Sequence, residues 1–90
     1  MTNIEISKPS EDALDEMGVH HWPIWTCDVS KFDWHYDQGE TCYILEGDVT
    51  VIVGDEQVTF GAGDMVVFPE GLDCTWDVKA PVRKHYKFGP

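Results

Sequence analysis

Hydrophobic and polar residues alternate along most of the chain from Trp22 onward. A period of two is typical of strands with one buried face, because successive side chains of a strand point to opposite sides. Short groups of Gly, Pro and Asp interrupt the alternation, with turns expected at Glu46–Asp48 and Ala80–Pro81 among others. We predict eight strands, at Trp25–Val29, Phe32–Tyr36, Thr41–Glu46, Asp48–Val53, Gln57–Phe60, Asp64–Phe68, Cys74–Val78 and Val82–Phe88.

The first 21 residues follow another pattern. Residues 3–7 alternate as a short strand, and Ser10 begins a helix whose first turn is acidic, as the helix dipole favours. Gly18 is a natural helix terminator. The buried stripe of this helix is expected at Ala13, Leu14 and Met17. Many short strands with regular turns indicate an all-β sandwich or barrel, with the strand and helix of residues 1–21 preceding a barrel of residues 22–90.

Composition limits the class of protein further. With 90 residues, 42% of them hydrophobic, the chain forms one domain with a packed core. Its net charge of −11 argues against nucleic acid and against an anionic membrane surface as partners. The chain has no run of about 18 apolar residues and no signal-peptide pattern. Its three cysteines include no CxxC pair, so we expect a reduced, cytoplasmic protein.

The window of residues 32–47 concentrates the candidate chemistry. Asp33 and His35 share one face of a strand, and the rings of Phe32, Trp34 and Tyr36 share the other. If the polar face looks into the barrel, a small cluster forms there. Its expected members are Asp33, His35, Glu40 and Cys74, beside Cys42 and Trp76 as pocket residues, with Tyr43 a weaker pocket candidate because it points the other way.

The spacing of these residues resembles that of the cupin family. The first cupin motif is matched by Asp33-Trp34-His35, Glu40 after four more residues and Gly47 after six more, with Asp33 in place of the first His. The second motif is matched by Gly63, Pro69 and Gly71, with Cys74 in place of its His. The stretches ETCYILEGDVTV, GAGDMVVFPEGLDCTWDV and PVRKHYKF are similar to the small single-domain branch related to the (S)-ureidoglycine aminohydrolase cupin domain.

This resemblance implies a cupin-type β-barrel (double-stranded β-helix or jelly roll) over residues 1–90, with a short N-terminal helix. It also implies that Asp33, His35, Glu40 and Cys74 occupy the positions that hold a divalent metal (Mn, Fe, Ni or Zn) in many cupins. The departures at Asp33 and Cys74 leave a second interpretation open, in which no metal binds and Glu40 is a buried acid bonded to a barrel Tyr or Trp.

Two functions follow from these alternatives. The first is binding of a small polar metabolite in the barrel mouth, with His35, Glu40 and Cys74 as candidate catalytic residues of a metal-dependent enzyme resembling ureidoglycine aminohydrolase. The second is a non-catalytic cupin with a degenerate metal site that binds a metabolite or a protein. Cys74 is either a nucleophile with His35 as its base or a small buried apolar residue.

The remaining expectations concern the surface. If Asp33 and His35 face inward, the rings of Phe32, Trp34 and Tyr36 face outward and need cover from the N-terminal helix or a second subunit. The cupin resemblance implies that this second subunit belongs to a homodimer. His20, His21 and His85 are expected at the surface, with His85 also suited to an interface.

Overall fold

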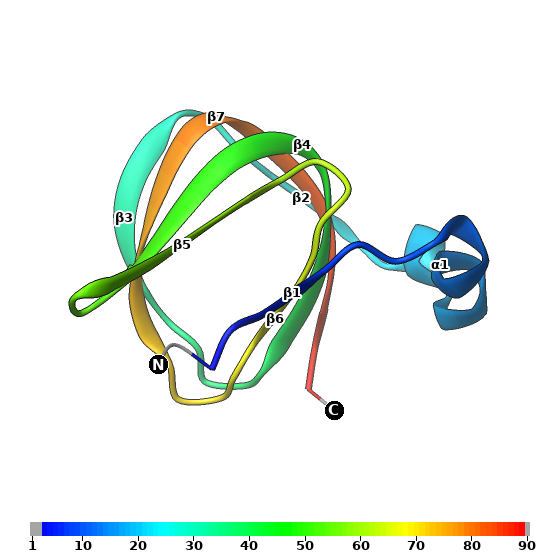
Figure 1. The fold of residues 1–90 in the computed structure, drawn as a ribbon, viewed down its shortest axis with the longest axis horizontal. Coiled ribbons are helices and arrows are strands. Elements are labelled where there is room, and N and C mark those ends of the chain that lie inside the picture. Colours follow the sequence, from blue (N-terminus) through cyan, green and yellow to red (C-terminus); the bar gives the residue numbers. More distant parts are fainter. Residues whose placement is uncertain (1–2, 90) are drawn as a thin grey trace.

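A computed structural model describes residues 3–89 of the chain. Figure 1 shows the strands curled into a ring, with the helix α1 outside it. No helix in this part of the chain combines the length and the hydrophobicity that crossing a bilayer requires. The elements in chain order are β1 (Glu5–Ser7), α1 (Glu11–Met17), the 3-10 helix η1 (Val19–His21), β2 (Ile24–Cys27), β3 (Ser30–His35), β4 (Glu40–Val53), β5 (Glu56–Gly61), β6 (Met65–Phe68) and β7 (Asp73–Phe88).

All strand pairs in the sheet are antiparallel. The strand order is β1-β6-β4-β7-β2, with β3 also paired to β7 and β5 also paired to β4. The long strands β4 and β7 therefore join every other strand of the barrel except β1, which is held by β6. The predicted all-β barrel with a short N-terminal helix is confirmed.

The predicted turns at Glu46–Asp48 and Ala80–Pro81 are wrong. The chain runs through both places as continuous strands, β4 and β7, each of which replaces two predicted strands. The register between β4 and β7 shifts three times between Ile44 and Val49, which marks β-bulges. Bulges bend a strand without ending it. Gly47 and Pro81 therefore lie at bends within continuous strands rather than in turns between strands.

The N-terminal helix is built as the sequence predicts at both ends. The side chain of Ser10 accepts a hydrogen bond from the backbone N–H of Ala13 at 3.2 Å, and Gly18 ends the helix with a left-handed φ of 70°. Leu14 is buried against Val19 and Met65 in a small cluster outside the barrel. The expectation for Met17 is wrong, because this side chain is 46% exposed. A helix of seven residues presents only a narrow stripe to the barrel.

The aromatic face of β3 points into the barrel, which reverses the predicted direction. Tyr36 is 1% exposed and stacks on Phe68, and Phe32 stacks on Trp76. Burying large rings is worth several kcal/mol in total, roughly 25 cal/mol per Å² of apolar surface, and this outweighs any gain from turning short polar side chains inward. Because the barrel itself covers Phe32 and Tyr36, these rings do not require a second subunit. The homodimer stays a prediction.

The polar face of β3 lies on the outside, where it finds partners on β7. The hydroxyl of Thr75 donates to Asp33 at 2.8 Å, and Nδ1 of His35 lies 2.6 Å from a carboxylate oxygen of Asp73. Both contacts join residues that lie directly opposite each other on the paired strands β3 and β7: Asp33 lies opposite Thr75, and His35 lies opposite Asp73.

Gly47 provides a test of the corner in β4. Its φ is 131°, and an added Cβ would lie 2.9 Å from the Val82 side chain and 3.2 Å from the Pro81 carbonyl oxygen. Gly63 also has a positive φ, of 89°, but an added Cβ there would meet nothing within 4 Å. We expect Gly63→Ala to cost about 1–2 kcal/mol of unfolding free energy from backbone strain, and Gly47→Ala to cost about 1–3 kcal/mol more from crowding. Urea unfolding measures both, and equal losses would contradict the corner packing.

Candidate functional site

A pocket of about 220 Å³ opens at the mouth of the barrel, where β2, β3, β4 and β7 meet. Trp34 and Phe88 are 48% and 45% exposed and form its rim, whereas Tyr36 and Trp76 are almost fully buried. Seven of its nine lining residues are aromatic, so the pocket is mainly apolar. The lining residues are Trp25, Phe32, Trp34, Tyr36, Glu40, Trp76, Lys84, Tyr86 and Phe88.

Two opposite charges are buried in this aromatic pocket. Nζ of Lys84 lies 3.1 and 3.3 Å from the two carboxylate oxygens of Glu40, and both side chains are about 95% buried. The ammonium also lies over the rings of Trp25 and Trp76, 4.8 and 4.5 Å from their centroids. Aromatic faces attract a cation, and a carboxylate neutralises it. The pair is therefore stabilised on several sides at once.

The strands explain how these charges meet. Glu40 begins β4 and shares its inner face with Cys42 and Ile44. Ile44 lies opposite Lys84 in the register between β4 and β7, so both point into the barrel. The side chain of Lys84 is long enough to reach the Glu40 end of the strand, where the aromatic walls surround it.

Two polar hydrogens near the ion pair are suited to a ligand. Burial, followed by the charge of Glu40, raises the pKa of the Tyr36 phenol far above its usual value, so this hydroxyl keeps its proton. Its oxygen accepts a hydrogen bond from Nε1 of Trp76 at 3.1 Å. Within residues 3–89, the hydrogen bonds of the Lys84 ammonium go only to Glu40, and an ammonium has three N–H groups. The pocket can thus donate from Tyr36 and Lys84 to an acceptor atom of a ligand.

The structure does not bring the four predicted metal positions together. Glu40 and Cys74 point inward, whereas Asp33 and His35 lie on the outer face. The predicted convergence of these four side chains is therefore wrong. The alternation in the sequence separates the two faces of β3 but does not show which one is buried. In the structure the aromatic face is the one that points into the barrel.

The remaining inward residues do not fit a divalent metal. The carboxylate of Glu40 is occupied by Lys84 at 3.1 Å, and a second positive charge at this place would meet the ammonium directly. His35, the only imidazole among the four positions, bonds Asp73 on the other side of the sheet. The side chains of this pocket therefore favour recognition by direct contact over chemistry through a metal-bound water.

Both inward cysteines have thiols of low reactivity. Burial raises the pKa of the Cys42 thiol to about 12. Burial, followed by the negative charges of Asp73 and Asp33, raises the pKa of Cys74 to about 11. His35 lies on the opposite face of β3 and cannot act as the base of Cys74. The environment of Cys74 therefore matches a buried apolar residue rather than a nucleophile.

Lys84 is the main functional residue that the sequence interpretation missed. In the sequence it belongs to a short basic cluster, although it shares its strand face with Val82 and Tyr86, which is a signal for an inward side chain. The surface prediction for His85 is wrong as well. His85 is 6% exposed, because η1 covers the outer face of β7 and the carbonyl oxygen of Trp22 lies 2.9 Å from its Nδ1.

The other predicted pocket and surface residues have clear places. Trp76 lines the pocket, and Cys42 is fully buried next to the Glu40–Lys84 pair without lining the pocket. Tyr43 lies outside the barrel, against the cluster around Leu14. His20 and His21 are exposed.

The antiparallel barrel is that of a cupin. The chain belongs to the family of EutQ-like cupin domains, whose model matches residues 14–86. It is similar to a DUF861 family protein from Thermotoga maritima, with 50% identity and a TM-score of 0.93 over 96% of this chain and 99% of that one.

More distant structures share the fold. The EutQ protein of Clostridium difficile is 22% identical with a TM-score of 0.69, over 74% of this chain and 53% of that one. A cupin-2 domain protein from Shewanella frigidimarina is 23% identical with a TM-score of 0.60, over 70% and 63% of the two chains. Comparison with curated proteins gave no significant match. The closer resemblance to ureidoglycine aminohydrolase stays a prediction.

The buried ion pair generates a stability prediction. Lys84→Met keeps the length of the side chain but leaves the Glu40 carboxylate buried without its cation. We expect a loss of about 3–5 kcal/mol in the free energy of unfolding, measured with urea. The matched double variant Lys84→Met/Glu40→Gln removes both charges and should recover most of that loss. A single variant within about 1 kcal/mol of the wild type would contradict a tightly coupled pair.

The thiol environment generates a pH prediction. Below a pKa of about 11 the Cys74 thiol is mostly protonated, so its reaction with iodoacetamide should be slow at about pH 7 and rise about tenfold per pH unit up to about pH 9.5. Cys27 is only partly buried and serves as the internal control, which should react faster at every pH in that range. Peptide mass spectrometry gives both rates. A Cys74 rate that is already constant near neutral pH would indicate a reactive thiolate.

Proposed function

We propose that this chain is a small-molecule-binding cupin that holds its ligand in the aromatic mouth pocket without a metal ion. One observation carries this proposal: the buried acid that the cupin pattern retains, Glu40, is neutralised by Lys84 inside a pocket with seven aromatic walls. The pocket offers surface for binding and two hydrogen-bond donors for orientation. It offers no vacant set of metal ligands.

The pocket favours a small planar ligand. Its volume of about 220 Å³ lies below the roughly 300–1,000 Å³ of sites for drug-sized molecules, but above the roughly 150 Å³ of an engineered cavity that holds benzene. Aromatic walls favour a flat or apolar body. The N–H of Lys84 and the O–H of Tyr36 favour an acceptor at one end, such as a carbonyl or a carboxylate. The ligand is then less polar than the metabolite that the sequence suggested.

The metal-dependent alternative, an enzyme resembling ureidoglycine aminohydrolase, requires a different arrangement. A metal at Glu40 would have to displace Lys84 from two carboxylate oxygens and two aromatic faces. His35 would also have to leave Asp73 and cross the sheet. The observed contacts therefore favour binding by the side chains alone.

Tryptophan fluorescence tests the proposal directly, because Trp25, Trp34 and Trp76 line the pocket and Trp22 is the only other tryptophan. Titration with benzamide and with benzoate, two planar probes that end in acceptors, should quench the emission saturably. Benzylamine, which has the same ring but ends in a cation, should not. EDTA should leave the affinities unchanged. Binding that disappears with EDTA and returns with Mn²⁺ or Zn²⁺ would support the metal-dependent alternative instead.

A rim residue supplies the matched control. Trp34→Ala removes one aromatic wall that is 48% exposed, so it should weaken benzamide binding roughly three- to tenfold without unfolding the barrel. Val29→Ala changes an apolar side chain that is 62% exposed and lies outside the pocket, and it should have no effect. Saturable binding that is equal in both variants would place the ligand elsewhere.

A further inference from the structure

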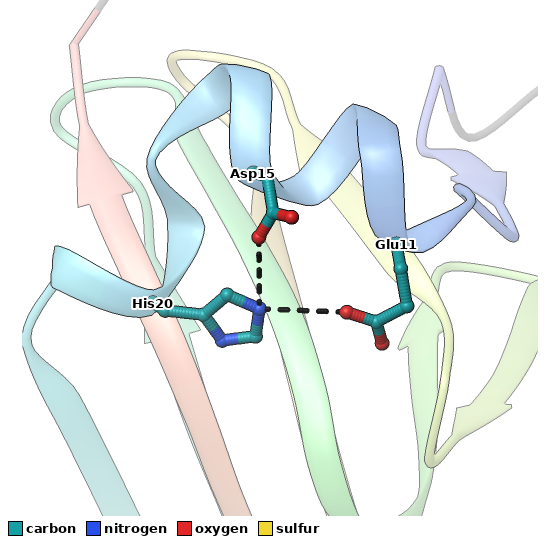
Figure 2. A group of neighbouring side chains, drawn as sticks. All are labelled: Glu11, Asp15 and His20. Atoms are coloured by element: carbon teal, nitrogen blue, oxygen red, sulfur yellow. Dashed lines mark ion pairs between the residues drawn. The ribbon is translucent and has the colours of Figure 1, made fainter.

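The outer side of the N-terminal helix carries a second cluster of side chains, separate from the mouth pocket. Nε2 of His20 lies 3.7 Å from Oε2 of Glu11 and 3.9 Å from Oδ1 of Asp15, and the three atoms all lie within 4.8 Å of one another. Figure 2 shows the imidazole of His20 pointing at both carboxylates from a different turn of the chain. In the described part of the chain, this is the group whose spacing suits a metal ion.

The backbone places these three side chains together. Glu11 and Asp15 are one helical turn apart on α1, so they lie on the same side of the helix. Gly18 then ends the helix with a left-handed φ of 70°, and η1 follows directly, so that the side chain of His20 points back toward α1 (Figure 2). Val19, which is fully buried, fixes η1 against the barrel next to His20.

His20 is further positioned by the strand below it. Its ring and that of His85 form a T-shaped pair with a centroid distance of 5.9 Å. His85 is itself buried, with Nδ1 2.9 Å from the carbonyl oxygen of Trp22. The imidazole of His20 therefore has a packed support on one side and presents Nε2 to the two carboxylates on the other.

The distances fit ligands of one ion better than direct hydrogen bonds. At 3.7 and 3.9 Å, Nε2 is too far from either oxygen for a hydrogen bond, which needs about 2.7–3.2 Å. Two ligand atoms that each lie about 2.0–2.2 Å from the same zinc ion are roughly 3–4 Å apart. Within residues 3–89, neither carboxylate is paired with a Lys or Arg side chain. The cluster thus combines two negative charges and a ring nitrogen around a shared centre.

We propose that Glu11, Asp15 and His20 form a binding site for a divalent transition-metal ion of the zinc class. The imidazole selects Zn²⁺, Co²⁺ or Ni²⁺ over Mg²⁺ and Ca²⁺, which prefer ligand sets made only of oxygen. Three protein ligands leave a further coordination position for water or for an external group. The side chains are between 46% and 79% exposed, so the ion reaches the site from solvent.

Metal binding at this place would act on the N-terminal segment. The helix has only seven residues and contributes one buried side chain, Leu14. Helices of this length are marginal without tertiary support. An ion bound by α1 and η1 together would hold the helix to η1, which is anchored on the barrel. Because the three ligands are close together only while the helix is docked, ion binding stabilises the docked helix over the opened segment.

Isothermal titration of the EDTA-treated chain, prepared without a polyhistidine tag, tests this site. Titration with ZnCl₂ should give one equivalent of binding, and CaCl₂ at the same concentrations should give none. His20→Ala and Asp15→Asn should each weaken Zn²⁺ binding at least tenfold. His21→Ala, which changes the neighbouring exposed imidazole, and His35→Ala, which changes the imidazole beside Asp73, should each leave it unchanged.

Amide hydrogen exchange gives a readout that does not depend on the heat of binding. Zn²⁺ should slow exchange in residues 11–21 of the wild type and have no such effect in His20→Ala, whose fold is checked by its unfolding curve. Absence of Zn²⁺ binding up to about 100 μM, or equal binding by His20→Ala, overturns the proposal. Equal binding of Ca²⁺ overturns the zinc-class assignment.

Discussion

The ion pair between Lys84 and Glu40 is the constraint on which the rest of this barrel depends. Two charges that are about 95% buried are tolerated only while they remain together, because separating them leaves an uncompensated charge in an aromatic environment. The pair joins the first residue of β4 to the distal half of β7, so it fixes the register of the two longest strands. It also requires aromatic neighbours that attract the ammonium, which Trp25 and Trp76 provide. These two tryptophans, together with the rings packed around them, form the walls of the pocket.

The same pair gives the buried acid of this cupin a partner within the chain. Lys84 places a covalently tethered cation beside Glu40, which neither dissociates nor depends on metal supply. A tethered ammonium brings no Lewis-acid geometry and no bound water. What it leaves is a neutral, preorganised floor with donors from Lys84 and Tyr36. The binding function that we propose for this pocket rests on shape, aromatic surface and hydrogen bonding.

Much of the fold could be predicted from the sequence, because alternation and turn residues report strands directly. The alternation assigns Glu40, Cys42, Cys74 and Trp76 to the inner face, where they lie. The direction of β3 could not be read in the same way. Alternation shows that Asp33 and Trp34 point to opposite sides, but the choice of the buried side depends on how much ring surface the rest of the barrel can cover. Lys84 was missed for a related reason, since a lysine inside an acidic protein is expected at the surface unless its partner is known. The merging of strands at Gly47 was hidden because a glycine in a bulge and a glycine in a turn look alike in sequence.

Strand β7 connects the two faces of the molecule through neighbouring residues. Lys84 points into the pocket, and His85, the next residue, points outward beneath η1 and lies against Trp22. Opening of β7 from β4 would therefore disrupt the pocket floor and the seat of the N-terminal helix in a single event. The seat of the helix on β7 is therefore lost together with the pocket floor, whereas the short helix itself, which buries only Leu14, can leave that seat while β7 stays paired.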